Sequence, residues 1–183
     1  MPLPAHSFAR LLRRFRRNRS GVTAVEFALV APLFFALLFA IIEVAMIFFA
    51  SQVLETATQD SSRFVMTGQA QGANYTQAQF KTFVCGEVSS ALFDCTNGIY
   101  VDVRSYPATS FSTVNLTPIT DPTQVKWCPG KDGDVVVVRL FYQWPLFVTK
   151  AFTSTFLSNG KRLLVATATF KNEPSGTAGT TCS

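Results

Sequence analysis

The sequence predicts an α+β protein: a long N-terminal transmembrane helix extends into a small extracytoplasmic domain with a second helix and an antiparallel sheet of about three strands. One early apolar stretch is long enough to cross a bilayer, the later apolar runs are short and β-branched or alternating, and every cysteine follows the apolar stretch. Hydrophobic residues make up 48% of the chain and charged residues 15%, which excludes a disordered protein. A length of 183 residues excludes a large multidomain enzyme.

The positive charge is confined to the N-terminus. The chain has 16 Lys and Arg against 11 Asp and Glu, for a net charge of +5. Six arginines and no acidic residue precede Gly21: Arg10, Arg13, Arg14, Arg16, Arg17 and Arg19. Residues 1–21 therefore form a basic leader. Because a membrane flank accounts for the arginines and no recognition motif follows them, we expect no nucleic-acid partner.

Residues 22–50 form the apolar stretch, and its only charges are Glu26 and Glu43. A helix that crosses the hydrocarbon core needs about 20 apolar residues, whereas the apolar part of a secretory signal has about 7–15. We therefore predict one transmembrane helix. The arginines before it predict a cytoplasmic N-terminus and an extracytoplasmic C-terminal domain by the positive-inside rule.

The two glutamates of this stretch differ in depth. A carboxylate at the bilayer centre costs about 2.5–3.5 kcal/mol, so Glu26, taken alone, is expected to reach water at the cytoplasmic interface. Glu43 lies about 31 Å further along a helix than Val22, at a rise of about 1.5 Å per residue. We expect Glu43 to reach the outer interface without a further role.

Two helices are predicted outside the membrane. Residues 51–68 lack proline and have no glycine before Gly68, so the first helix is expected to continue and end there. Its predicted buried stripe is Val53, Leu54, Ala57, Phe64 and Val65. Thr76 and Gln79 have the spacing of a capping box, which predicts a second helix from Thr76 to about Phe93 within a head domain of residues 69–183.

Three strands are predicted in the head. Ile99, Val101 and Val103 alternate with polar residues, as in a half-buried strand. Residues 134–144 are mostly β-branched or aromatic, which indicates a central strand, and residues 161–170 alternate again. The segment 145–159 is apolar enough for a covering loop or an interaction surface. Its partly exposed side chains are expected to be Phe147, Phe152, Phe156 and Leu157.

The four cysteines, Cys85, Cys95, Cys128 and Cys182, all lie on the predicted outer side. An oxidising compartment favours two disulfides, although three connectivities are possible. We favour the local pair Cys85–Cys95, with Cys128–Cys182 at the tail. A zinc site is the competing interpretation, but the short C-x₂₋₄-C spacing typical of one is absent.

The sequence contains no recognisable catalytic constellation. Its only histidine is His6 in the leader, and it has no nucleotide-binding or hydrolase motif. Residues 131–134 are expected to form a turn, because a calcium loop would need more ligands. We therefore expect no enzyme activity, no cofactor and no metal.

Gly21, four further residues, Glu26 and Phe27 follow the arginine leader and open the apolar stretch. This arrangement resembles the prepilin-peptidase site of type IV pilin-like proteins, and more narrowly that of pseudopilins in tight-adherence (Flp/Tad) pilus systems. Residues 28–33 and the later Ile41-Ile42-Glu43 are similar to TadE-like proteins, so the resemblance covers about residues 13–66. About 115 residues follow the long helix, more than a major Flp pilin carries.

The resemblance implies a minor pseudopilin that acts in pilus biogenesis, initiation or adhesion; TadE-like and TadF-like roles remain open. It implies cleavage between Gly21 and Val22 by an inner-membrane prepilin peptidase, and an assembly and recognition role for Glu26 and Phe27. The implied partners are the bacterial inner membrane, other pilins or pseudopilins and the pilus assembly platform. The implied location is a single pass through that membrane with a periplasmic C-terminal domain, followed by incorporation into a surface pilus.

The alternative is an uncleaved single-pass signal-anchor protein whose extracytoplasmic domain binds a ligand or an envelope partner. A membrane-tethered enzyme is a third hypothesis, which the missing catalytic motifs disfavour.

Overall fold

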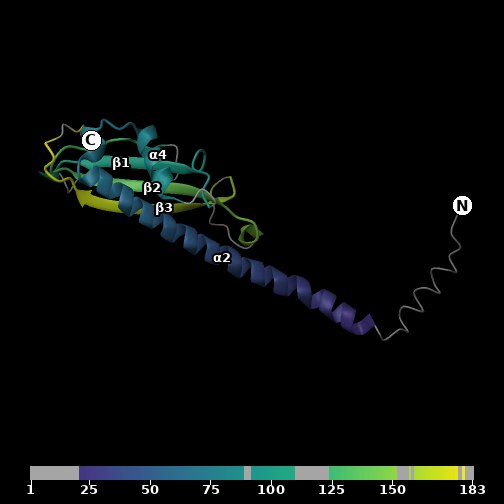
Figure 1. Cartoon of the computed structure of the whole chain (residues 1–183). Coiled ribbons are helices and arrows are strands. Elements are labelled where there is room, and N and C mark those ends of the chain that lie inside the picture. The colour runs from purple at the N-terminus through teal and green to yellow at the C-terminus, as the bar shows by residue number, and fades with distance from the viewer. Residues whose placement is uncertain are drawn as a thin grey trace, which may run out of the picture. The chain divides into compact units, whose positions relative to one another are not determined.

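The computed structural model describes residues 21–88, 92–109, 124–151, 157, 159–176 and 179. Its elements are α2 (Val22–Met66), α3 (Gln69–Gly72), α4 (Gln77–Glu87), β1 (Ile99–Tyr106), β2 (Val135–Pro145), η3 (Thr149–Ala151) and β3 (Lys161–Lys171). The strands form one antiparallel sheet in the order β1-β2-β3, so the predicted α+β class is confirmed (Figure 1). The chain divides into two compact units, Met1–Ile42 and Glu43–Ser183.

Helix α2 is continuous over 45 residues and includes Pro32. It ends as predicted, because Gly68 adopts a positive φ of 76°, a left-handed conformation that glycine enters without a steric penalty. The Gly68 N–H donates to the carbonyl oxygen of Val65 at 3.0 Å, which satisfies one of the last free carbonyls of the helix.

In the second unit, α2 buries a side chain at every third or fourth position. The buried residues are Glu43, Ile47, Ala50, Leu54, Ala57, Thr58, Ser61, Ser62 and Val65. This spacing places them on one face of the helix, where the apolar members join the core with residues of α4 and the sheet. Leu54, Ala57 and Val65 of the predicted stripe are buried, while Val53 and Phe64 are partly buried against the same core.

Helix α4 begins as its sequence predicts. Gln79 N donates to Thr76 Oγ1 at 3.3 Å, and Thr76 N donates to Gln79 Oε1 at 2.9 Å, which is the expected capping box. The expected end at Phe93 is wrong, because α4 stops at Glu87 and Val88 is extended. A disulfide explains the early stop. It holds the Cα atoms of Cys85 and Cys95 5.8 Å apart, whereas a continuous helix would separate them by about 15 Å.

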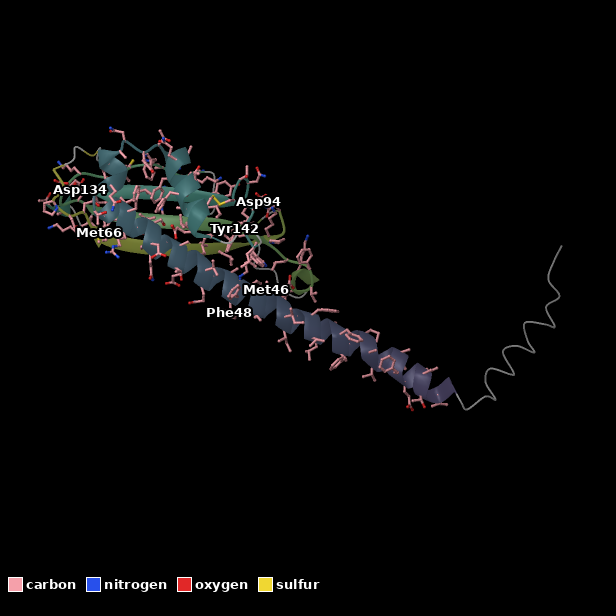
Figure 2. The ribbon with its side chains drawn as sticks, viewed as in Figure 1. Met46, Phe48, Met66, Asp94, Asp134 and Tyr142 are labelled. Carbon is pink, nitrogen blue, oxygen red and sulfur yellow. A yellow bond between two sulfur atoms is a disulfide. The ribbon has the colours of Figure 1, made fainter. Side chains whose placement is uncertain are left out.

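The Cys85–Cys95 disulfide is the local pair that the sequence favoured, and it lies close to Asp94 in Figure 2. Cys128 is also disulfide-bonded. The partner expected for it, Cys182, lies outside the described residues.

The sheet register places one apolar face against the helices. β1 and β2 pair with Val101 opposite Leu140, and β2 and β3 pair with Leu140 opposite Ala166. All three side chains are buried members of the core. β2 is the central strand, as its β-branched and aromatic composition predicted.

The opposite face of the sheet contains a buried charge that the alternating pattern of β1 did not predict. Asp102, expected on the polar side of a half-buried strand, is fully buried. Its Oδ2 accepts from Arg139 Nη2 at 2.6 Å and from Arg104 Nε at 3.0 Å. Arg139 lies directly opposite Asp102 in the register, 37 residues along the chain, so the pair depends on strand pairing and not on local sequence.

We predict that Asp102→Ala lowers the free energy of unfolding by about 3–5 kcal/mol, because two guanidinium groups lose the carboxylate they share in a buried site. Chemical denaturation of the full chain in detergent, followed by circular dichroism, measures this change. The matched control is Asp60→Ala, since Asp60 is exposed on α2. A loss below about 1 kcal/mol, as for a surface ion pair, would contradict a structural role for Asp102.

Candidate functional site

The expected cleavage site lies at the start of α2. Gly21 is exposed, and among the described residues no atom lies within 4 Å of the position that a Cβ would occupy there. Val22 and Phe27 are 50% and 68% exposed, and Glu26 is exposed as well. Val22 and Glu26 are four residues apart, so they share one face of the helix. The six leader arginines lie outside the described residues.

Large apolar side chains are exposed along α2 from its first turn to Phe49. They are Val22, Val25, Phe27, Leu29, Val30, Leu33, Phe34, Phe35, Leu37, Leu38, Phe39, Ile41, Ile42, Val44, Met46, Phe48 and Phe49. An apolar surface of this extent is unfavourable in water and favourable in lipid. By length and composition the helix is able to cross a membrane, and it is the candidate membrane anchor.

Glu43 is buried, with an exposed fraction of 8%, whereas the sequence predicted that it would reach the outer interface without a further role. The carboxylate accepts hydrogen bonds from three successive backbone N–H groups. Phe147 N donates to Oε1. Val148 N and Thr149 N both donate to Oε2, at 3.0 Å and 2.7 Å. Ionised acceptors form hydrogen bonds about twice as strong as neutral ones. Glu43 therefore fastens the turn before η3 to α2.

The role of Glu43 was not predictable from its neighbours in the sequence. Its donors are backbone groups more than 100 residues away, and a backbone N–H carries no side-chain signal. The one available signal was an acidic residue within an apolar run, where a charge needs partners.

Two carboxyls outside the apolar part of α2 have pKa values below their usual 3.8. The backbone N–H of Asn97 is the main group that lowers the pKa of Asp94. The backbone N–H groups of Ser175 and Gly176 lower the pKa of Asp132. A lowered folded-state pKa contributes stability that is present above 3.8 and is lost as the pH falls through the folded value. Both carboxylates thus hold their loops at neutral pH.

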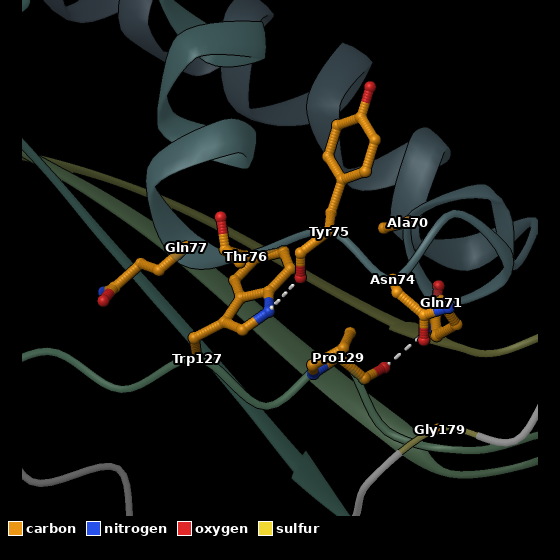
Figure 3. A pocket seen from close by; sticks show the side chains of 9 residues that line it. All are labelled: Ala70, Gln71, Asn74, Tyr75, Thr76, Gln77, Trp127, Pro129 and Gly179. Carbon is orange, nitrogen blue, oxygen red and sulfur yellow. Dashed lines mark hydrogen bonds between the residues drawn. The ribbon is translucent and has the colours of Figure 1, made fainter.

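A pocket of about 350 Å³ lies just beyond the C-terminal end of α2 (Figure 3). Glu43 is at the other end of the part of α2 that belongs to the second unit. Its lining residues are Ala70, Gln71, Asn74, Tyr75, Thr76, Gln77, Trp127, Pro129 and Gly179. Trp127 Nε1 donates to the Tyr75 carbonyl oxygen at 2.8 Å, and Gln71 Nε2 donates to that of Pro129 at 2.9 Å. Among the described residues, no group donates to the buried Gln71 Oε1. No sequence motif marked this pocket.

The turn expected at residues 131–134 is present. Asp134 N donates to the Lys131 carbonyl oxygen at 3.1 Å, and Lys131 N donates to Asp134 Oδ2 at 3.1 Å. Within the part of the chain that the structure describes, no three His, Cys, Asp or Glu side chains gather as metal ligands.

These features define a class of protein: one helix supplies an exposed apolar anchor and, further along, a core element of an α+β head. The family model described as TadE-like protein matches residues 21–63, which begin at Gly21 and end within α2. The chain is therefore similar to TadE-like proteins over residues 21–63, which is consistent with a pilin-like protein of the Tad system. The searches of curated proteins and of solved structures found no match.

We predict that Glu43→Ala accelerates tryptic cleavage after Lys150 by about tenfold, because three backbone N–H groups lose their acceptor and the loss costs about 1–3 kcal/mol. Mass spectrometry of timed digests of the detergent-solubilised chain measures the rate. Glu55→Ala is the matched control, since Glu55 is exposed on the same helix. If Glu43→Ala and wild type are cut after Lys150 at equal rates, Glu43 does not hold the turn.

Proposed function

We propose that this protein is a minor pilin-like subunit of a tight-adherence pilus, and that the inner membrane holds it until assembly. The observation that carries the proposal is the TadE-like match, because it begins at the expected cleavage residue and covers the exposed apolar helix. The head domain that follows the helix is larger than the head of the major subunit of such a pilus. A minor role in biogenesis, initiation or adhesion therefore fits the chain better.

In this proposal, residues 1–21 are a cytoplasmic leader, residues 22–50 span the membrane, residues 51–68 continue the helix outside, and residues 69–183 form the periplasmic head. A prepilin peptidase cuts between Gly21 and Val22. The exposure of Gly21 supports this step, since a residue without a side chain lets the protease approach the backbone closely. Cleavage removes all six arginines and leaves an α-amino group on Val22.

Assembly then depends on Glu26. A carboxylate in the hydrocarbon core costs about 2.5–3.5 kcal/mol, and pairing with the amine of Val22 in a neighbouring subunit would offset that cost. Phe27 completes the recognition segment beside it. The exposed apolar side chains of α2 would exchange lipid for other pilins or pseudopilins, with the assembly platform as a further partner.

The second candidate is an uncleaved signal-anchor protein whose head binds a small ligand. The pocket beside Trp127 favours it, because Gln71 Oε1 is a buried acceptor on the pocket wall to which no described residue donates. A ligand hydroxyl or amide would supply that hydrogen bond. This candidate predicts that the leader stays on the chain.

We predict that Glu26→Ala leaves membrane insertion and cleavage intact but lowers incorporation into pili by at least about tenfold, because the amine of the neighbouring subunit loses its partner. Immunoblots of sheared surface pili and of the membrane fraction measure the two pools. Glu55→Ala is the control, because it removes an exposed carboxylate from the same helix. Equal recovery of Glu26→Ala and wild type in the pilus fraction would refute the assembly role.

A further inference from the structure

The turn held by Glu43 presents an exposed aromatic side chain. Phe147 is 81% exposed, more than any large apolar side chain of α2, and Leu146 and Val148 beside it are half-buried. Because the N–H groups of Phe147 and Val148 donate to the Glu43 carboxylate, the turn is fixed against α2 at the level of that residue. A single exposed phenylalanine is common on protein surfaces, so what lies around this one decides what it contacts.

The level of Glu43 coincides with the expected outer edge of the bilayer. Glu43 lies about 31 Å along the helix from Val22, close to the hydrocarbon thickness of about 30 Å. Beyond Glu43 the exposed side of α2 remains apolar, since Met46, Phe48 and Phe49 are 39%, 68% and 55% exposed; Figure 2 labels Met46 and Phe48 there. Phe49 lies about 9 Å past Glu43. The head thus contacts one side of α2 where the other side still suits lipid.

Three exposed basic residues lie near the turn, one just after it and two at the start of β3: Lys150, Lys161 and Arg162. Lys161 lies opposite Pro145 in the sheet register, directly before the turn, and Arg162 lies opposite Trp144. The Lys150 Nζ is 2.7 Å from the position that a Cβ on Gly160 would occupy, so Lys150 lies against the residue before Lys161. Each such cation near an anionic lipid surface contributes about 1 kcal/mol of attraction.

We propose that the turn Leu146–Val148 inserts into the outer leaflet of the membrane that α2 spans, with Phe147 at the interface and Lys150, Lys161 and Arg162 on the headgroups of anionic phospholipids. The inference rests on the membrane anchor of the proposed function and does not depend on cleavage or pilus assembly. Lipid fits better than a second copy of the chain, because the exposed apolar surface of the turn lies at the level where α2 is itself apolar and exposed, and cations border it. Aromatic residues are typical of this interface.

Depth-dependent fluorescence quenching tests the proposal on the full chain in vesicles of phosphatidylcholine and phosphatidylglycerol. Phe147→Trp places the reporter on the turn, and Val165→Trp is the matched control, since Val165 is 53% exposed on β3. The signal is the fluorescence that each variant adds to that of Trp127 and Trp144. We expect lipids with brominated acyl chains to quench Phe147→Trp at least about twofold more than Val165→Trp, and aqueous acrylamide to show the reverse order.

Two results would overturn the insertion. One is acrylamide quenching of Phe147→Trp equal to that of Val165→Trp without an effect of brominated lipid. The other is protection of Phe147→Trp from both quenchers that rises with the protein-to-lipid ratio, which would assign the turn to a second copy. Flotation of the chain with the vesicles distinguishes a turn that does not insert from a helix α2 that does not anchor the protein. Only the absence of anchoring leaves the protein unbound.

The headgroup part of the proposal has its own variant. Replacing Lys150, Lys161 and Arg162 together by glutamine should lower the brominated-lipid quenching of Phe147→Trp in the anionic vesicles to the level measured in pure phosphatidylcholine. Unchanged quenching in the anionic vesicles would overturn the assignment of anionic headgroups.

Discussion

The structure depends on one helix that must suit two environments. Up to Ile42 its large side chains, apart from Glu26, are apolar and mostly exposed, which suits lipid. From Glu43 onward it buries a residue at every third or fourth position and supplies Leu54, Ala57 and Val65 to the core of the head. The sheet face that contains Val138 and Leu140 shares its core with residues of this helix and of α4. The head therefore packs on the part of α2 that has a one-sided buried face.

Two buried carboxylates fix where the parts of the head meet. Asp102 faces Arg139 across β1 and β2, and a register slip of one residue would move it to the apolar face, where it has no guanidinium partner. Glu43 instead accepts hydrogen bonds from three backbone N–H groups. It therefore fixes the position along α2 at which the turn at Phe147 contacts the helix. Both contacts specify geometry, since a buried charge costs free energy unless its partners lie in one arrangement.

Local sequence signals predicted the helices and strands, whereas long-range contacts produce the features that the sequence did not predict. Gly68 and the Thr76 capping box marked helix ends because their chemistry acts within one turn, and the β-branched run marked β2 because its side chains suit a pleated, buried surface. The early end of α4, the buried Asp102 and the capped Glu43 depend on partners far along the chain, which no local pattern contains. For Gly21 and Glu26 the sequence supplies the motif and the structure adds that both are exposed.

The mass of the protein in cells most directly tests the proposal that α2 is the first element of a mature subunit. Intact mass spectrometry would compare the protein from cells with and without the prepilin peptidase. We expect a mature chain that starts at Val22 when the peptidase is present and the full-length precursor when it is absent. A leader retained in both strains would contradict it and favour the signal-anchor protein, and a chain that starts after Ala50 would contradict both.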